Sequence, residues 1–299
     1  MSARPRASAE VPLLSVLIPA YNFPEGVGRA LASMGPLHGR ADVEVVVSDD
    51  STDMARAEAI EQITAGCDGA RYTHNRPPLG AARNWNHLLR QARGEYCLIL
   101  HHDEYLESAS VLGEILQVLA APHAPDGVVL PCKIDKGGHQ LRRHMPTALS
   151  RWVVRRLPGY LLRRNVLGSP SVWVLRRSRY EPFDERLQWY VDVELYARVL
   201  ARRSTRWAFL RGSGIVSDLS LETSITRTLK GGLAAVRRSE LELMQRSGAL
   251  VGRGSWLMGT AALARVARPI ESLAWAAFRV LWRVGQSLRA VVPARSPHA

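Results

Sequence analysis

The first half of the chain alternates short apolar runs with stretches of helical pattern, and this alternation constrains the fold more than any other feature. The apolar runs are rich in valine, isoleucine and leucine and are bounded by polar or turn-forming residues, which is typical of buried strands. Strand–helix alternation predicts an α/β fold with a mainly parallel sheet and helices on both faces. The expected strands are 14–18, 43–47, 71–74, 96–100, 128–130 and 172–175, and the expected helices are 25–34, 54–63, 81–93 and 110–120. Gly94 is expected to end the helix 81–93, because glycine often lies just past a helix end.

The chain length and the cysteine content limit the class of protein to which this chain can belong. With 299 residues and 46% hydrophobic residues, the chain can bury one large core, with or without an appended segment. Its three cysteines, Cys67, Cys97 and Cys132, have no CxxC spacing. This argues against a disulfide framework and a zinc site, and it favours a reducing, cytoplasmic compartment. The apolar run 11–20 is interpreted as a strand and not as a signal peptide. No stretch reaches the ~18 uncharged apolar residues of a membrane span.

The net charge of +13 is distributed unevenly. Residues 1–139 hold 12 Lys and Arg against 17 Asp and Glu, a balance of −5, whereas residues 140–299 hold the remaining 28 and 10, a balance of +18. The two halves are therefore expected to face different partners. A basic surface suits anionic substrates, membrane headgroups or nucleic acid, and the count alone does not separate them.

Polar clusters follow three of the expected strands, at 19–22, 48–53 and 101–104. In parallel α/β sheets, ligands bind at the carboxyl ends of the strands. The clusters at 48–53 and 101–104 are acidic and would repel a bare phosphate. We therefore expect one of them to accept hydrogen bonds from a base or ribose, and the other to hold a divalent cation that receives the phosphates.

Both acidic clusters also have a structural interpretation. Ser51 or Thr52 can cap the helix 54–63, with acidic neighbours that the helix dipole favours, and residues 101–104 can form a polar turn. Capping does not explain the carboxylate pair Asp49 and Asp50, and four consecutive potential ligands are unusual in a turn. Oxygen ligands of this kind suit Mg²⁺ or Mn²⁺, whereas no HxxxH or CxxC pattern points to zinc.

Five short motifs follow one another in the first half: SVLIPAYN at 15–22, SDDSTD at 48–53, GAARN at 80–84, GEY at 94–96 and LHHDE at 100–104. In this order and spacing they resemble motifs of the family 2 glycosyltransferases, which have the GT-A fold and invert the anomeric centre. The resemblance runs from about Pro12 to about Thr226. It implies a nucleotide-sugar donor, a divalent metal, and transfer of the sugar to an acceptor hydroxyl.

The same resemblance assigns roles on the donor side. Tyr21 would flank the base, Asp50 would bond to it, and Arg83 would seat the nucleotide, although Arg83 can also be a solvated helical charge. The donor-binding residues that the resemblance implies are Pro19, Tyr21, Asn22, Asp50, Arg83 and His102.

Asp103 matches the family position that ligates the donor-bound Mn²⁺ or Mg²⁺. His101 and Glu104 stand where the family has aspartates. Together with Asp103, they are the metal ligands that the resemblance implies. This departure keeps a rival hypothesis open, namely a catalytically inactive relative that binds a nucleotide sugar or a glycan.

The acceptor side is assigned to the segment 168–194. Asp192 matches the acidic residue near a helix start that serves as the catalytic base in the family, although it can also decorate an amphipathic helix. Gly168 and Ser169 form a small-residue turn that suits close approach by a ligand. Together with Trp189 and Glu194, they are the expected acceptor-binding residues. Asp218 is a candidate replacement for a further family ligand, a histidine. One carboxylate base and one metal on opposite sides of the sugar agree with inversion.

The second half interleaves arginines with aromatic residues. The run 151–164 can bind single-stranded nucleic acid, but its place between the donor motifs and the base favours a segment over the acceptor site. Beyond about Leu229 the chain has a helical pattern, in which four arginines share one stripe: Arg265, Arg268, Arg279 and Arg283. These helices either pack on the catalytic domain or lie on an anionic membrane surface.

The sequence thus predicts a flexible N-terminus at 1–11, a GT-A-like domain at 12–228 and a basic helical appendage at 229–299. The expected partners are a nucleotide-sugar donor, a glycan or lipid-linked acceptor and an anionic membrane surface at the cytoplasmic face, but no nucleic acid. The sugar, the nucleotide base and the oligomeric state are left open. A sugar nucleotidyltransferase is disfavoured, because the first strand is not followed by a Gly-rich basic loop.

Overall fold

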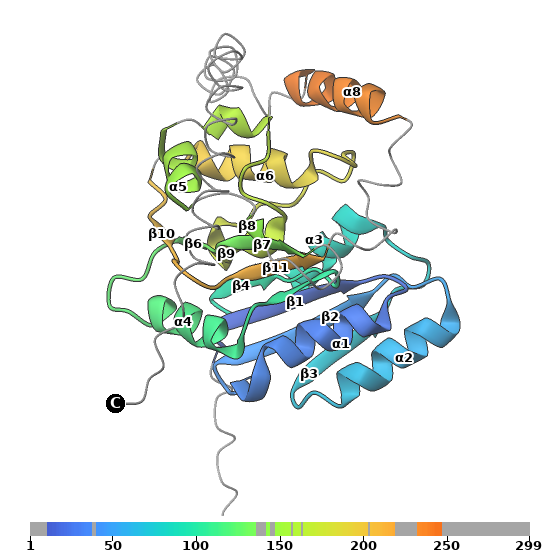
Figure 1. Ribbon diagram of the computed structural model, residues 1–299. Helices are drawn as coiled ribbons and strands as arrows, with labels where there is room; N and C mark the ends of the chain where they lie inside the picture. Colours follow the sequence, from blue (N-terminus) through green and yellow to red (C-terminus); the bar gives the residue numbers. More distant parts are fainter. Residues whose placement is uncertain are drawn as a thin grey trace, which may run out of the picture.

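The computed structural model describes residues 11–37, 40–135, 142–143, 147–156, 158–162, 164–202, 204–218 and 232–246. In this part of the chain a sheet of seven strands has the order β10-β6-β9-β4-β1-β2-β3, and helices cover both of its faces (Figure 1). The strands are β1 (Leu14–Ala20), β2 (Val43–Asp49), β3 (Ala70–His74), β4 (Tyr96–Ile99), β6 (Gly127–Val129), β9 (Trp173–Arg176) and β10 (Trp207–Phe209).

The sheet is mainly parallel, which confirms the predicted fold class. β1 pairs in parallel with β2 and with β4, so that Leu14 has Val43 on one side and Tyr96 on the other. β2 with β3 and β6 with β10 are parallel as well. β9 is the exception, because it lies antiparallel between β4 and β6. β9 returns the chain to the centre of the sheet just before the segment that carries Asp192.

The helices form one layer on each face of the sheet. On one face lie α1 (Pro24–Ser33), α2 (Met54–Ala65) and α4 (Ala109–Leu119), and on the other lie α3 (Ala81–Gln91), α5 (Thr147–Arg156) and α6 (Val191–Leu200) (Figure 1). All residues of β1 are buried. Val16 and Ile18 pack in the core between the sheet and the helices α1, α2 and α4, and Leu17 packs in the core between the sheet and α3, α5 and α6. Burial on both faces explains why the strand is apolar throughout. The bounds of α1 to α4 agree with the predicted helices to within two residues at each end.

A second, smaller sheet was not predicted from the sequence. Its described strands are β5 (Glu104–Leu106), β11 (Ile215–Asp218), β7 (Cys132–Asp135) and β8 (Arg142–Arg143), in that order. β11 pairs antiparallel with β5, which sets Ser217 opposite Glu104. The sheet therefore connects the end of β4 to a segment that is more than a hundred residues away in sequence. Four single 3-10 turns complete this part of the chain: η1 (Gly35–Leu37), η2 (Pro158–Leu162), η3 (Pro170–Val172) and η4 (Arg177–Arg179).

Two helix ends differ from the sequence interpretation. The carboxylate of Asp53, and neither Ser51 nor Thr52, caps α2 by accepting from the backbone N–H groups of Ala55 and Arg56. α3 ends at Gln91, so Gly94 does not terminate it. Gly94 instead serves close packing, because a Cβ atom there would lie 2.6 Å from the backbone nitrogen of Ser15.

The predicted terminal segments fall largely outside the described residues. Of the helical appendage at 229–299, the structure describes residues 232–246 with the helix α8 (Leu233–Arg246). The four stripe arginines beyond residue 260 and the flexible start at 1–10 lie outside the described part. Among the described helices, none combines the length and the apolar character that a membrane crossing requires.

A buried carboxylate joins the amino ends of the central strands. Glu44 of β2 is only 4% exposed and accepts hydrogen bonds from Ser15 Oγ (2.5 Å), Arg93 N (2.5 Å) and Gly94 N (3.2 Å). The guanidinium groups of Arg71 and Arg93 pair with its other oxygen at 3.0 and 2.9 Å. Burial alone would raise the pKa of Glu44, but these donors outweigh it and lower the pKa to about 2. The ionised carboxylate thus holds β1, β2, β3 and the segment before β4 together.

We expect Glu44→Gln to lower the free energy of unfolding by about 2–4 kcal/mol at pH 7, because a neutral amide leaves buried donors without an acceptor. Urea unfolding measures this difference. The folded-state pKa is below the ordinary value of 4.5, so the stabilisation is fully present above about pH 4.5 and is lost as the pH falls toward 2. The difference in unfolding free energy between the variant and the wild type should therefore become smaller at acidic pH. Glu58→Gln, at an exposed position of α2, is the control and should change stability by less than about 0.5 kcal/mol.

Candidate active site

A cavity of about 810 Å³ lies at the carboxyl ends of β1, β2 and β4. Loop residues before β9 and the start of α6 form its other wall. It brings together most of the site residues expected from the sequence, namely Pro19, Tyr21, Asp50, His101, His102, Asp103, Glu104, Gly168, Ser169, Trp189 and Asp192. Asn22, Arg83 and Glu194 do not line it.

Asp50 is buried and is held by the segment after β3. Its carboxylate accepts hydrogen bonds from Asn75 Nδ2 (2.8 Å) and from the backbone N–H groups of Leu79 (3.1 Å) and Gly80 (2.8 Å). Because the side chain is fixed by three donors, it presents an ordered acceptor to the cavity. A carboxylate has room for about four hydrogen bonds, so one further donor from a ligand can still be accepted.

The end of β1 contributes Pro19 and Tyr21 to the same wall. A ring nitrogen of His102 lies 2.9 Å from the carbonyl oxygen of Pro19, which links the end of β1 to the end of β4. The Tyr21 side chain is 46% exposed, so an aromatic face is available to a flat ligand at the rim. The side chain of Asn22, in contrast, stabilises the neighbouring loop through hydrogen bonds. Its side-chain oxygen accepts from the backbone N–H groups of Thr52 and Asp53, both at 3.1 Å, and its φ is +49°.

His101, Asp103 and Glu104 form a compact group whose ligand atoms all lie within 4.8 Å of one another. The Nε2 atom of His101 is buried without a hydrogen-bond partner, and burial lowers the pKa of this histidine to about 4, so the imidazole is neutral at pH 7. Burial and the neighbouring Asp103 raise the pKa of Glu104 to about 7. A neutral imidazole beside two carboxyl groups is a donor set that suits a divalent cation, so these residues fit a metal ion.

The turn at Gly168 connects the metal-binding candidates to the start of α6. Asn165 organises this turn: its Oδ1 accepts from the N–H groups of Leu167 and Gly168, and its Nδ2 donates to the carbonyl of Gly168 (2.8 Å). Gly168 has φ +116°, which residues with a side chain rarely adopt. The hydroxyl of Ser169 then donates to Glu104 Oε2 (2.6 Å). Sequence analysis did not identify Asn165, whose contacts form only in the folded chain.

Asp192 lies in the first turn of α6 and borders the cavity. One oxygen accepts from the backbone N–H of Val193 (2.8 Å), and the other accepts from Asn165 Nδ2 (2.7 Å). Burial raises the pKa of Asp192 to about 7, although these hydrogen bonds favour its ionised form. A carboxylate with a pKa near neutrality that faces a cavity can take a proton from a bound hydroxyl group.

The structure gives Arg83 and Glu194 partners away from the cavity. The guanidinium of Arg83 is 64% exposed and pairs with Glu185 at 3.2 Å. The buried carboxylate of Glu194 accepts two hydrogen bonds from Arg198, at 2.6 and 2.8 Å. The buried Asp218 pairs with Arg29 at 2.9 Å, and its backbone N–H donates to the carbonyl of Asp103. In this conformation all three therefore support the framework around the site.

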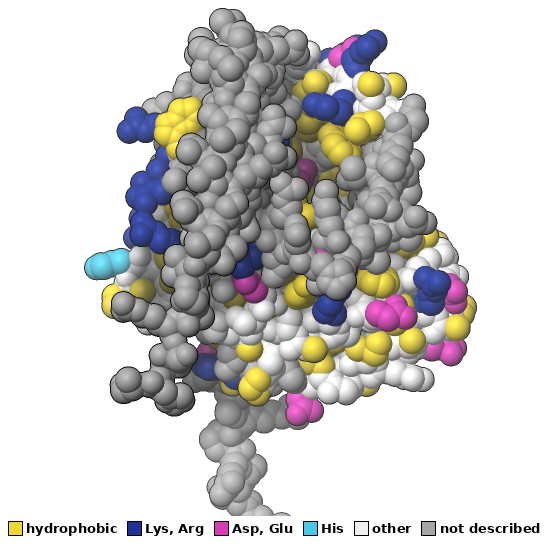
Figure 2. Space-filling model, viewed as in Figure 1, with side chains coloured by type: hydrophobic (Ala, Val, Ile, Leu, Met, Phe, Trp, Pro, Cys, Tyr) yellow, Lys and Arg dark blue, Asp and Glu magenta, His cyan; other side chains and the backbone are white. Residues whose placement is uncertain are grey.

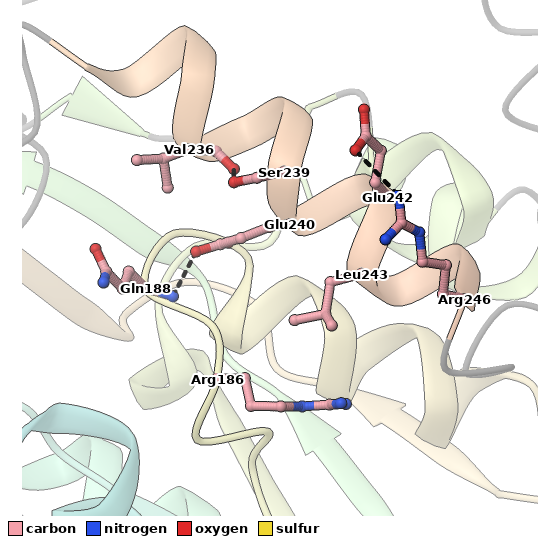
Figure 3. Close-up of a pocket in the computed structure, with 8 residues that line it drawn as sticks. All are labelled: Arg186, Gln188, Val236, Ser239, Glu240, Glu242, Leu243 and Arg246. Atoms are coloured by element: carbon pink, nitrogen blue, oxygen red, sulfur yellow. Dashed lines mark hydrogen bonds and ion pairs between the residues drawn. The ribbon is translucent and has the colours of Figure 1, made fainter.

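A second feature that sequence analysis missed is the role of α8. Glu240 is 5% exposed, and its carboxylate accepts from the backbone N–H groups of Gln188 (2.6 Å), Trp189 (3.1 Å) and Tyr190 (2.9 Å). Tyr190 is the N-cap residue of α6, but its side chain forms no capping hydrogen bond. Glu240 therefore supplies the acceptor for the amino end of the helix that carries Asp192. Figure 3 shows Glu240 pointing from α8 toward the backbone at Gln188, across a smaller cavity of about 390 Å³.

Residues 15–181 match the family model of glycosyl transferase family 2. The chain belongs to this family. The matched region contains the donor-side residues and the metal-binding candidates, whereas Asp192 and α8 lie beyond it. An uncharacterized protein of Mycobacterium tuberculosis (strain CDC 1551 / Oshkosh) is 39% identical over 248 residues, which cover 77% of this chain and 73% of that protein.

Solved structures of similar fold agree with the family. TarS of S. aureus (residues 1–349, in complex with UDP-GlcNAc) superimposes with a TM-score of 0.55 at 20% identity, over 71% of this chain and 60% of that one. GalNAc-T7, in complex with UDP, GalNAc and Mn²⁺, gives a TM-score of 0.52 at 15% identity, over 71% of this chain and 45% of that one. The chain thus spans 60% or less of the length of these two chains. At such identities the likeness establishes the GT-A fold.

We expect Asp192→Asn to raise the melting temperature at pH 8 by several degrees, on the order of 5 °C. The folded-state pKa of about 7 exceeds the ordinary value of 3.8, so the ionised carboxyl destabilises the fold. This cost is absent below about pH 4 and complete above about pH 7, so the gain should shrink as the pH falls. Melting curves from pH 5 to 8 measure it.

Asp184→Asn is the matched control, because hydrogen bonds from Arg186 lower the pKa of Asp184 and its ionised form stabilises the fold. That variant should melt at a lower temperature than the wild type at pH 8. If Asp192→Asn is also less stable at pH 8, the carboxyl is not destabilised by burial.

Proposed function

We propose that this protein transfers a sugar from a nucleotide-sugar donor to a hydroxyl group of a glycan or lipid-linked acceptor, with inversion at the anomeric carbon. One observation carries the proposal: a single cavity is lined by a fixed carboxylate at the end of β2, by the cluster of His101, Asp103 and Glu104 after β4, and by Asp192. Membership in glycosyl transferase family 2 supports the same reaction class.

The donor is proposed to bind at the ends of β1 and β2. Asp50 accepts a hydrogen bond from the base, and the exposed ring of Tyr21 flanks the base at the rim. Pro19 and His102 complete this side of the cavity. Asn22 supports the loop beneath the nucleotide through its contacts to Thr52 and Asp53. A role of Arg83 in donor binding would require it to leave Glu185, which its exposure on the surface permits.

Asp103, His101 and Glu104 are proposed to hold a divalent cation. Carboxylate oxygens suit both Mn²⁺ and Mg²⁺, whereas an imidazole ligand favours Mn²⁺, because Mg²⁺ prefers an all-oxygen shell. When bound, such a cation neutralises the charge that grows on the departing diphosphate. Ser169 keeps Glu104 oriented toward the cluster by donating a hydrogen bond to Oε2.

Asp192 is proposed to accept the proton of the acceptor hydroxyl as this hydroxyl attacks the anomeric carbon. Asn165 and the N–H of Val193 hold the carboxylate, while Gly168 and Trp189 leave room for the acceptor beside it. One carboxylate base and one metal ion on opposite sides of the sugar favour direct displacement, and hence inversion. An anionic membrane surface as a further partner, and a place at the cytoplasmic face, stay predictions that rest on residues outside the described part of the chain.

The second candidate function is nucleotide-sugar or glycan binding without catalysis. It is motivated by His101 and Glu104, which replace the usual aspartates of the family motif. Donor turnover decides between the two functions. A protein that binds donor but neither transfers nor hydrolyses it, with any acceptor of a broad panel, would be a binding protein.

We expect donor binding to depend on a divalent cation held by Asp103. A thermal-shift screen of UDP-, GDP- and dTDP-sugars should show stabilisation with Mn²⁺, which excess EDTA or Asp103→Ala removes. Asp68→Ala, at an exposed position before β3, is the control and should retain the full shift. Equal shifts with and without a metal ion would contradict the assignment of these ligands.

We expect Asp192→Asn to reduce turnover on the order of 10²–10⁴-fold while donor affinity changes little, because the base acts on the acceptor. The wild-type rate should fall as the pH drops below about 7, where Asp192 becomes protonated. Initial rates with nucleotide-sugar and acceptor across pH 5–9, together with donor titrations of the variant, measure both effects. Normal turnover by the variant would show that the base is another residue.

A further inference from the structure

The helix α8 lies outside the region matched by the family model, yet it is anchored to the catalytic segment. Glu240 is bound by three consecutive backbone N–H groups, from Gln188 to Tyr190, just before α6. A buried carboxylate that accepts several charge-assisted hydrogen bonds holds its element firmly. The α8 residues on the same face as Glu240 are therefore held next to the start of α6 (Figure 3).

Arg237 is one helical turn before Glu240, so its side chain leaves α8 on the same face. It lines the large cavity, its Nε donates to the hydroxyl of Tyr190 at 3.1 Å, and its guanidinium lies 5.8 Å from the centre of the Tyr190 ring. Within the described part of the chain, no ion pair joins Arg237 to a carboxylate. Since a guanidinium has five N–H donors, Arg237 can offer several hydrogen bonds to a ligand in the cavity.

A second arginine, Arg164, lines the same cavity from the segment that leads to Gly168. The two arginines thus come from the two elements, α8 and the segment before Gly168, that flank Asp192. The acidic residues of the cavity are Asp50, Asp103 and Glu104, which follow β2 and β4, and Asp192 itself. Arg164 and Arg237 therefore place positive charge on the side of the cavity that holds the proposed base, whereas the ends of β2 and β4 contribute carboxyl groups.

Figure 2 shows that basic side chains also gather along the edge of the molecule in the region of α5 and β10. On α5 the exposed residues include Arg151, Arg155 and Arg156, with Trp152 51% exposed among them. A basic surface of this kind increases the local concentration of anionic molecules around the domain, but it does not select one at the site. Selection requires a fixed guanidinium inside the cavity, which α8 supplies through Arg237.

We propose that Arg237, together with Arg164, binds an anionic group of the acceptor, a phosphate or a carboxylate, and thereby makes the enzyme selective for anionic acceptors. This inference rests on the proposed function, since it concerns the acceptor of that reaction. Arginine suits the role because its planar fork of N–H donors matches the oxygens of both groups. The anion would lie beside Asp192, so that a hydroxyl of the same molecule reaches the base.

The test compares anionic compounds with their neutral counterparts. Tryptophan fluorescence reports binding, because Trp85 and Trp189 line the cavity. The donor site is first filled with Mn²⁺ and the nucleoside diphosphate that gives the largest thermal shift. Glucose 6-phosphate and glucuronate are then titrated against glucose, and citronellyl phosphate against citronellol. The first set tests sugar phosphates and carboxylates, and the second tests a lipid phosphate.

We expect the wild type to bind at least one anionic compound at least about tenfold more tightly than its neutral counterpart, since hydrogen bonds to charged groups are among the strong ones. Arg237→Gln should abolish this preference and leave nucleotide affinity unchanged, and Arg237→Lys should retain part of it. Arg238→Gln is the matched control: Arg238 is the next residue of α8 and is exposed, so this variant should keep the full preference.

Three results would overturn the inference. The first is a wild type without preference for any anion, and the second is a preference that survives Arg237→Gln. The third is a loss of nucleotide affinity in Arg237→Gln, which would assign the guanidinium to the donor diphosphate. A wild type that binds no nucleoside diphosphate at all would instead overturn the proposed function, and that result is obtained before any anion is added.

Discussion

The parallel pairing of β1 with both β2 and β4 is the constraint on which the candidate site depends. The three strands run in one direction in a continuous register, so their carboxyl ends meet at one edge of the sheet. The strand pairing alone therefore brings the polar residues that follow each strand close together. At the opposite ends of the strands, the buried carboxylate of Glu44 joins β1, β2 and the segment before β4. Strand pairing and the hydrogen bonds and ion pairs of Glu44 together fix the strands whose carboxyl ends border the cavity.

The carboxyl groups at the two ends of the central strands and at the start of α6 fall into two classes by the balance between burial and hydrogen bonding. Asp50 is supplied with donors by its own chain, and Glu44 is ionised well below its ordinary pKa. For Glu104 and Asp192 burial outweighs the hydrogen bonds that favour the ionised form, so their pKa values rise to about 7. The first class stabilises the framework, and the second costs stability but keeps groups ready to exchange protons or to bind a cation. Such a division is typical of an enzyme site, where the fold tolerates locally destabilised groups.

The side of the cavity around Asp192 depends on contacts between segments that are far apart in the chain. The residues before α6 receive their hydrogen-bond acceptor from Glu240, about fifty residues further along. Ser169 reaches Glu104, and β11 pairs with β5 on the same side of the cavity. α8 therefore packs next to α6 although it follows the family-matched region, and packing on the domain is one of the two placements expected for the helices beyond about Leu229. The anchor also explains how Arg237 can lie at a defined place in the cavity.

Local pattern and motif order by themselves determined the class of fold and the edge of the sheet at which the cavity lies. Apolar runs, helix periodicity and the polar residues after β1, β2 and β4 are local features, because each depends on neighbours a few residues away. They were sufficient to predict that Asp50 and Asp103 lie at one edge of the sheet, and the family resemblance added Asp192; the three residues line the same cavity. The tertiary structure alone decided the antiparallel return of β9 and the small second sheet. It also decided that Arg83 pairs with Glu185 and Glu194 with Arg198. It decided as well that Asn165 bonds to Asp192, that Glu240 bonds to the backbone before α6, and that Arg237 lines the same cavity as Asp192. A charged or amide side chain can find a partner anywhere on the folded surface, and one sequence does not record which partner the packing of distant segments brings within hydrogen-bond distance.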